Sequence, residues 1–260
     1  MALIFPQLQS GAVAQLPLAR LEGYRTLRNA LSDGSAIQIS DTDFEQVGWT
    51  LKYSELTADE VQALQSLFQG AEGRLNTFTF VDPSANLLSW SGELTQAVWT
   101  VDPQLALTSV GDAFGGTAGT QIANGAATLQ SVSQTSNAPG ALQYCFSAYL
   151  RTDMSAAEVT FQIGGTAVLT AAVTGTWQRW QAVATGGTST QVVFGLAIAP
   201  GVTVQVCGLQ VEAQPAAGVY KSTTATGGVF TSSRFDQDAM NVTATDAGLF
   251  GCSVRIVSQL

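Results

Sequence analysis

The residues of this chain best suited to bind a ligand are Trp177, Arg179 and Gln181, three alternating positions in one segment. Alternate residues of a β-strand point to the same side of a sheet, so these three side chains would share one surface. The flat apolar face of an exposed aromatic ring can stack on a sugar ring. The segment is therefore a candidate glycan-binding face. The alternative is core packing, which is where most tryptophan surface is buried.

The titratable residues of the chain do not indicate a catalytic site. The chain contains no histidine, which excludes Ser-His-Asp and Cys-His arrangements and removes the commonest nitrogen ligand of zinc. A pair of carboxylates could still hydrolyse a glycosidic bond, but none of the acids in the middle of the chain stands in a segment that indicates such a pair. We expect no enzymatic activity, no catalytic residue and no cofactor. The acids considered are Glu93, Asp102, Asp112, Asp153, Glu158 and Glu212.

Metal binding and disulfide bonds are also not expected. Two Asp-x-Asp pairs, Asp41–Asp43 and Asp236–Asp238, lack EF-hand spacing and fall short of the roughly six to eight oxygens that calcium requires. We interpret them as solvated turn residues and predict no metal site. Cys145, Cys207 and Cys252 are odd in number and form no CxxC motif, which indicates unpaired thiols buried in a reducing compartment.

The composition narrows the class of protein further. Of the 260 residues, 46% are hydrophobic and only 11% are charged, with a net charge of −9. A large core can be buried, whereas an acidic chain without a basic track is not expected to bind nucleic acid. No apolar run is long enough to span a membrane. Pro6 interrupts the first apolar run and no basic segment precedes it, so we expect no signal peptide.

The clearest local signals lie between Thr57 and Pro83. Thr57 followed by Glu60 is a capping box, and apolar residues recur at helical spacing as far as Phe68. This pattern predicts a helix over residues 57–70, and Phe78–Val81 is predicted to be a buried strand. The preceding residues 1–56 are predicted to be rich in β-structure, with a hairpin turn at Asp33-Gly34 and a half-buried strand in WTLKY.

The remainder of the chain suggests one domain inserted into another. Residues 86–222 contain short apolar segments at intervals of about 8–12 residues, which is typical of a β-sandwich or jelly roll. Residues 223–260 contain strands but too little apolar surface to fold alone. The sequence therefore predicts a mainly β protein: a discontinuous β-sandwich domain with one α-helix, made of residues 1–85 and 223–260, and an inserted antiparallel jelly roll, residues 86–222.

Arginines gather in the predicted first domain, although the chain as a whole is acidic. Arg20, Arg25, Arg28 and Arg234 are four of only ten basic residues. Planar guanidinium groups make bidentate contacts with carboxylates and can fix the register between subunits. These residues are candidates for a subunit interface, and the alternative is ordinary solvated charge.

Five segments carry a resemblance to a known family: WTLKY, TADEVQALQSLFQG, GRLNTFTFVDP, SSRFDQDAMNV and SVRIVSQL. Their organisation resembles bacteriophage tail proteins of the distal-tail and minor-tail type. This resemblance implies a small β-sandwich with one helix that forms a ring at the lower end of a tail and often carries an inserted domain.

The predicted insert resembles the jelly-roll modules of carbohydrate-binding type found in tail and fibre proteins. The matching segments are NLLSWSGELTQAVWT, YCFSAYLR, GTWQRWQAVA and VQVCGLQVEAQPAAGVY. Together the resemblances imply a tail-tip or baseplate component of the virion, assembled in the host cytoplasm. Its implied partners are copies of itself, other tail proteins and host-surface carbohydrate. The alternative is a stand-alone carbohydrate-binding adhesin.

Overall fold

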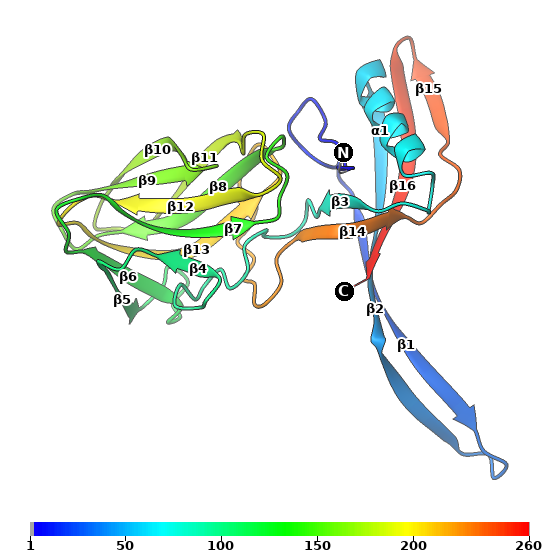
Figure 1. Cartoon of the computed structure of the whole chain (residues 1–260), viewed down its shortest axis with the longest axis horizontal. Helices are drawn as coiled ribbons and strands as arrows, with labels where there is room; N and C mark the ends of the chain where they lie inside the picture. The colour runs from blue at the N-terminus through cyan, green and yellow to red at the C-terminus, as the bar shows by residue number, and fades with distance from the viewer. Residues whose placement is uncertain (1–2, 260) are drawn as a thin grey trace. The chain divides into compact units, whose positions relative to one another are not determined.

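The computed structural model describes residues 3–259, except for the side chains of residues 42–44. The chain divides into two compact units. One contains the N-terminal residues as far as Leu8, then Ala14–Phe80, and the chain from Phe230 onward; the other contains Gln9–Val13 and Val81–Val229. Figure 1 shows the elements of each unit. The predicted fold class is confirmed: within the described residues, the protein is mainly β, with one helix and antiparallel sheets.

The first unit is built on a six-stranded sheet in the order β1-β2-β16-β14-β3, with β15 paired to β16. The last strand of the chain lies beside β2, and Ile256 is opposite Trp49 in the register. The predicted strand WTLKY is thus a central part of the sheet. The strands are β1 (Ala19–Ala30), β2 (Ala36–Leu56), β3 (Phe78–Val81), β14 (Val229–Phe235), β15 (Val242–Asp246) and β16 (Leu249–Gln259).

Helix α1 (Ala58–Gly70) begins and ends at the predicted residues. Thr57 is its N-cap: Glu60 N–H donates to Thr57 Oγ1 at 3.4 Å, and Thr57 N–H donates to Glu60 Oε2 at 2.9 Å. These two bonds satisfy backbone donors that would otherwise lack partners at the helix start. Asp59 and Glu60 also place negative charge where the helix dipole favours it.

Aromatic rings fill the core of the first unit. Trp49 lies 4.8 Å from Phe80, measured between ring centroids, and Phe80 lies 5.3 Å from Phe5. Phe78 contacts Phe235 from β14 at 4.7 Å, and Phe68 of the helix contacts the same ring at 5.0 Å. The helix, the N-terminal segment and the last strands therefore share one core, although they are far apart in the sequence.

The tip of the β1–β2 hairpin extends beyond the rest of this sheet (Figure 1). Among the described residues, β16 pairs with β2 from Gln46 onward, whereas residues 36–41 and Glu45 of β2 pair with β1. The predicted turn at Asp33-Gly34 is present, and Gly34 has the positive φ of 86° that such a turn requires. The chain from Ala36 to Leu56 is one strand of 21 residues, longer than the separate short strands that the pattern indicated.

The turn predicted at Asp41–Asp43 is not present in the structure. Instead, these residues lie within β2, where the register with β1 shifts opposite Tyr24 and Arg25. Asp41 forms an ion pair with Arg25, and the side chain of Asp43 lies outside the described residues. The irregularity is a bulge, because extra residues of β2 have no opposite partner in β1.

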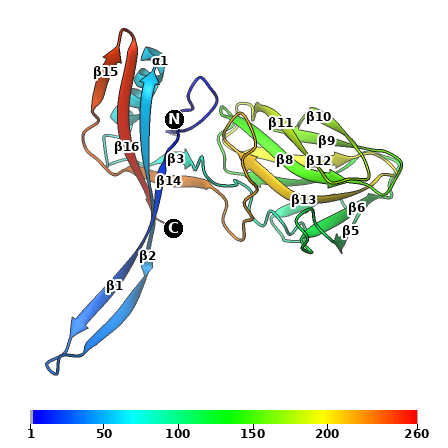
Figure 2. The same cartoon turned by 180° about the vertical axis from the view of Figure 1, so that it is seen from behind.

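The second unit consists of two five-stranded sheets (Figure 2). Their orders are β10-β9-β12-β7-β4 and β11-β8-β13-β6-β5, and every neighbouring pair is antiparallel. Phe146 of one sheet meets Phe161 of the other at 5.2 Å, so the core lies between them. The strands are β4 (Trp99–Val101), β5 (Leu105–Val110), β6 (Gly119–Asn124), β7 (Gln130–Ser136), β8 (Gln143–Arg151), β9 (Ala157–Ile163), β10 (Thr166–Val173), β11 (Gln178–Thr185), β12 (Val192–Ile198) and β13 (Thr203–Glu212).

The polar segment that follows β13 is tied to the start of this unit. Thr223 Oγ1 donates to Leu88 O at 2.7 Å, and Trp90 N–H donates to Thr224 O at 2.7 Å. Asp82 N–H also donates to Gly228 O at 2.8 Å. The chain therefore enters and leaves this unit along hydrogen-bonded neighbouring segments. Among the described residues, no helix is both long and apolar enough to cross a membrane.

We predict that Thr57→Ala lowers the free energy of unfolding by about 1 kcal/mol, because alanine lacks the Oγ1 atom that accepts the hydrogen bond from Glu60 N–H. The measurement is urea unfolding followed by circular dichroism. Ser66→Ala is the matched control: Ser66 is an exposed helical residue away from the cap, and alanine there should be neutral or slightly stabilising. Equal stability of the two variants would show that the cap does not stabilise the helix.

We also predict that a chain ending at Lys221 loses the sheet of the first unit, because the truncation removes β14, β15 and β16. Amide hydrogen exchange should then become fast in β2, whose N–H and C=O groups lose the β16 ladder. The amides of β8 are the internal control and should stay protected. Protected β2 amides in the truncated chain would contradict the discontinuous domain proposed from the sequence.

Candidate functional site

The outer face of the sheet β11-β8-β13 carries polar and aromatic side chains. Phe146 and Leu150 of β8 point into the core, so Ser147 and Tyr149, which alternate with them, point outward. Arg179 of β11 lies opposite Tyr149, and Gln181 lies opposite Ser147. The predicted sharing of a face by Arg179 and Gln181 agrees with this register.

The segment from Gln214 to Lys221, here called the strap, lies across part of this face. Gly218 O accepts a hydrogen bond from Arg179 Nη1 at 2.6 Å, and Gly218 N–H donates to Glu212 Oε2 at 2.8 Å. Lys221 N–H donates to Gln210 Oε1 at 2.7 Å. Glu212 and Gln210 are fully buried, so the strap supplies the partners that these polar groups need away from water.

Beside the strap lies an open hollow of about 730 Å³, here called the aromatic hollow. Its side chains include Phe114, Tyr149, Arg179 and Tyr220. The rings of Phe114 and Tyr220 are stacked at 5.5 Å with an interplanar angle of 5°, and Phe114 meets Tyr149 edge-on at 5.1 Å. The Arg179 guanidinium lies 5.4 Å from the centre of the Tyr149 ring. Flat rings beside a cation can hold a ligand with both an apolar face and polar groups.

The loop that carries Phe114 is ordered by Asp112. The Asp112 carboxylate accepts hydrogen bonds from the backbone N–H groups of Gly116 at 2.8 Å, Phe114 at 2.8 Å and Ala118 at 3.1 Å. These bonds, led by the one from Gly116, lower the pKa of Asp112. The carboxylate stays charged at neutral pH and fixes the loop, so Phe114 is presented on a defined turn although its side chain is 55% exposed.

The three residues predicted to bind glycan do not all lie in the aromatic hollow. Arg179 lines the aromatic hollow, while Gln181 Oε1 accepts a bond from Ala217 N–H of the strap at 3.0 Å. Trp177 is half-buried, and the guanidinium of Arg151 lies 5.5 Å from its ring centre. Trp180 lies opposite Ala148 on the inner side of the sheet. Of the three candidates, only Arg179 belongs to the hollow.

Sequence reasoning missed the aromatic members of the hollow. Tyr149 could have been found, because YCFSAYLR alternates and its outward set ends in Tyr149 and Arg151. Phe114 and Tyr220 lie in loops, where no periodicity marks which side chains converge. Tyr220 joins the others through Phe114 and through its hydroxyl, which is 3.0 Å from Ser91 Oγ.

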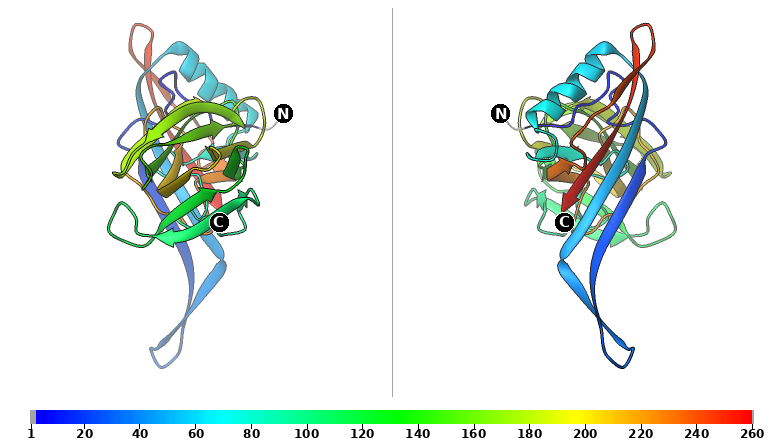
Figure 3. Two further views of the ribbon diagram at one scale, coloured as in Figure 1. Left: turned by 90° about the vertical axis from the view of Figure 1, so that its left-hand side faces the viewer. Right: turned by 90° about the vertical axis from the view of Figure 1, so that its right-hand side faces the viewer.

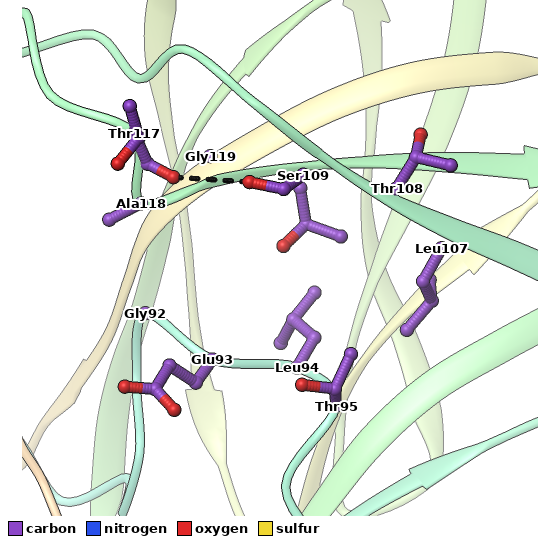
Figure 4. Close-up of a pocket in the computed structure, with 11 residues that line it drawn as sticks. Gly92, Glu93, Leu94, Thr95, Leu107, Thr108, Ser109, Thr117, Ala118 and Gly119 are labelled. Carbon is purple, nitrogen blue, oxygen red and sulfur yellow. Dashed lines mark hydrogen bonds between the residues drawn. The ribbon is translucent and has the colours of Figure 1, made fainter.

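A second hollow of about 350 Å³ lies where residues 92–95 approach β5 and the start of β6 (Figure 4). Hydroxyl groups of Thr95, Thr108 and Ser109 line it, and Ser109 Oγ donates to Thr117 O at 3.4 Å. Glu93 is the one carboxylate among its lining residues, and it accepts a bond from Gln96 at 2.8 Å. A single carboxylate cannot supply the acid and base pair of a glycosidase.

The four candidate interface arginines occupy two different places. Arg20, Arg25 and Arg28 lie on β1, all with exposed side chains. Arg20 pairs with Glu22 at 2.9 Å, and Arg25 pairs with Asp41. Arg234 lies on β14 and bonds Leu75 O of its own chain. The structure thus brings three of the four onto the hairpin and separates Arg234 from them.

The second Asp-x-Asp pair belongs to the first unit. Asp236 and Asp238 both approach Arg74, at 3.7 and 3.6 Å. Among residues 3–41 and 45–259, no group of three or more cysteine, aspartate or glutamate side chains is placed to hold a metal ion.

Comparisons with known proteins yield likenesses of fold. No family model matches the chain, and no curated protein matches it. The chain is similar to a CBM22 xylan-binding domain from Paenibacillus barcinonensis, with 17% identity and a TM-score of 0.42 over 53% of this chain and 97% of that one. It is also similar to a family 22 carbohydrate-binding module from Clostridium thermocellum, with 14% identity and a TM-score of 0.41 over 53% of this chain and 99% of that one.

A phage protein is among the similar structures. The enzymatically active domain of tailspike protein 4 from bacteriophage CBA120 shares 13% identity, with a TM-score of 0.36 over 50% of this chain and 22% of that one. None of these likenesses assigns a ligand, a partner or a residue role to this chain.

We predict that all three cysteines are free and react slowly with a thiol reagent in the folded protein. Cys145, Cys207 and Cys252 are buried and unpaired. Burial is the main cause that raises each thiol pKa to about 11, so only about one molecule in ten thousand is a thiolate at pH 7. Unfolding in denaturant should release three titratable thiols without added reductant. A count of one would reveal a disulfide.

Proposed function

We propose that this chain is a structural subunit of a phage-like tail tip that assembles with copies of itself and presents its jelly roll to a surface carbohydrate. The hairpin formed by β1 and β2 supports assembly, and the aromatic hollow supports carbohydrate binding. The proposal contains no catalytic step, no cofactor and no metal. Its location would be the virion, after assembly in the host cytoplasm.

The single observation that carries the assembly role is the two-faced tip of this hairpin. Leu27 of β1 lies opposite Ile39 of β2, and Ile37, which is opposite Asn29, follows two residues away on the same face. These three side chains are 49%, 49% and 48% exposed. Figure 3 shows the two strands running out as a ribbon past β16. The opposite face of the tip is polar, with Thr26, Arg28, Gln38 and Ser40.

A free ribbon of this kind is physically unfavourable. A two-stranded hairpin alone is marginally stable in water, and leaving large apolar side chains in water forfeits about 25 cal/mol for each Å² that could be buried. One apolar face and one polar face are what a sheet needs when one side packs on protein and the other meets water. The polar face carries Arg28, which has no carboxylate within ion-pair distance among the described residues.

We predict that the purified chain forms oligomers through this tip. Replacing Leu27, Ile37 and Ile39 together by serine should yield a monomer of about 27.1 kDa, because the substitutions remove the apolar contact between subunits. The fold should be retained, because these exposed side chains are not part of the hydrophobic core. The measurement is multi-angle light scattering after gel filtration, across a range of concentrations.

The matched control replaces Thr26, Gln38 and Ser40, on the opposite face, by alanine. This variant should assemble like the parent chain. The assembly role is wrong if the parent chain stays monomeric at the highest concentration, or if the serine variant and the parent have the same mass.

The second candidate function is a stand-alone carbohydrate-binding adhesin, which the aromatic hollow favours. The serine variant separates the two functions: a stand-alone adhesin would be a monomer already and would bind glycan with unchanged affinity. A tail-tip subunit would lose assembly but keep the binding of its jelly roll.

A further inference from the structure

We propose that the aromatic hollow binds a sugar that carries a carboxylate, as in a polysaccharide that contains uronic acid. This inference rests on the carbohydrate-binding part of the proposed function and names the class of ligand. It is independent of assembly. Arg179 is the residue that would select the acidic sugar, and Phe114, Tyr149 and Tyr220 would hold the ring.

The rings provide an apolar surface that is open to solvent. Phe114 and Tyr220 are nearly parallel, and the Phe114 side chain is 55% exposed. The C–H groups on one face of a pyranose can pack on such rings, whereas its hydroxyls remain directed to water or to polar groups. The backbone bonds of Asp112 hold the Phe114 loop before a ligand arrives, which reduces the ordering cost of binding.

Arg179 supplies an uncompensated positive charge. The second unit contains three cations, and two of them have a carboxylate within ion-pair distance: Arg151 pairs with Asp153 at 3.5 Å and Lys221 pairs with Glu212 at 3.2 Å. Arg179 has no such partner among the residues that the structure describes.

The geometry of Arg179 leaves donors for a ligand. Its Nη1 donates to Gly218 O at 2.6 Å and its Nη2 donates to Ser147 Oγ at 3.0 Å, while a guanidinium has five N–H groups in all. Each Nη atom therefore has one hydrogen left. The two existing bonds hold the side chain in place beside the ring of Tyr149. A fixed, planar guanidinium is suited to bind a carboxylate.

The neighbouring acids do not neutralise this charge at contact distance. Glu212 is fully buried and is bonded to Lys221 and to the strap. Asp112 uses both carboxylate oxygens to accept backbone N–H groups of its own loop. A ligand carboxylate beside Arg179 would thus supply the partner that the other two cations of the unit already have.

The test is binding of the full-length chain to an array of acidic and neutral oligosaccharides, followed by calorimetry with the best acidic ligand and its methyl ester. The acidic form should bind at least about tenfold more tightly, because esterification removes a charge-assisted hydrogen bond. Binding should weaken as the salt concentration rises, since Arg179 is partly open to solvent.

Two pairs of variants locate the site. Phe114→Ala should abolish binding, whereas Leu129→Ala, on a side chain that is 53% exposed and lies outside the hollow, should leave it unchanged. Arg179→Gln should remove the preference for the acid over its ester, and Arg151→Gln should retain it. Thermal unfolding of each variant checks that the fold is intact.

Three results would overturn the inference: no carboxylated glycan on the array binds, the methyl ester binds as tightly as the acid, or Phe114→Ala binds like the parent chain. Light scattering on the same samples reports assembly separately. A chain that assembles but binds no acidic glycan would refute this inference and leave the assembly role standing.

Discussion

The first unit depends on the pairing of one strand, β2, with two very different neighbours. Between Gln46 and Thr50 this strand pairs with β1 on one edge and with β16 on the other, and β16 continues beside it as far as Leu56. Its buried side chains include Trp49 and Leu51. Before Gln46, β1 is the one strand paired with it in the part of the chain that the structure describes. The part of β2 from Gln46 onward is therefore stabilised by packing in the hydrophobic core. The part before Gln46 is stabilised by one ladder of hydrogen bonds to β1.

The second unit combines a dense aromatic core between its two sheets with buried polar groups on the outer face of one sheet. The inner faces of its two sheets are filled by rings such as Phe146, Phe161 and Phe194. The outer face of β11-β8-β13 buries Ser147, Gln210 and Glu212, and such groups are costly unless they are bonded. The backbone of the strap bonds the side chains of Gln210 and Glu212, and Arg179 donates to Ser147 Oγ. The strap thereby leaves the hollow beside it, where Arg179 and the aromatic rings remain open to a ligand.

The sequence made local structure predictable where periodicity and capping are strong. Thr57 and Glu60 marked the start of the helix, and alternation marked the WTLKY part of β2, because these signals involve residues only a few positions apart. The single strand from Ala36 to Leu56 was not foreseen, since its exposed half has no core-facing alternation as regular as that of WTLKY. Asp41 was placed in a turn for a similar reason: a bulge within a long hairpin has the same composition as a turn.

The sequence alone determined the class of this protein: its mainly β character, its one capped helix, its three unpaired cysteines and the absence of histidine chemistry. It also placed Arg179 and Gln181 on the same face of one strand, because alternation in a strand is a local property. Only the tertiary structure decided that Phe114, Tyr149 and Tyr220 meet beside Arg179, and that Trp177 and Gln181 do not line that hollow. The physical reason is that loop positions and the pairing of distant strands follow from packing over the whole unit, which no short segment encodes.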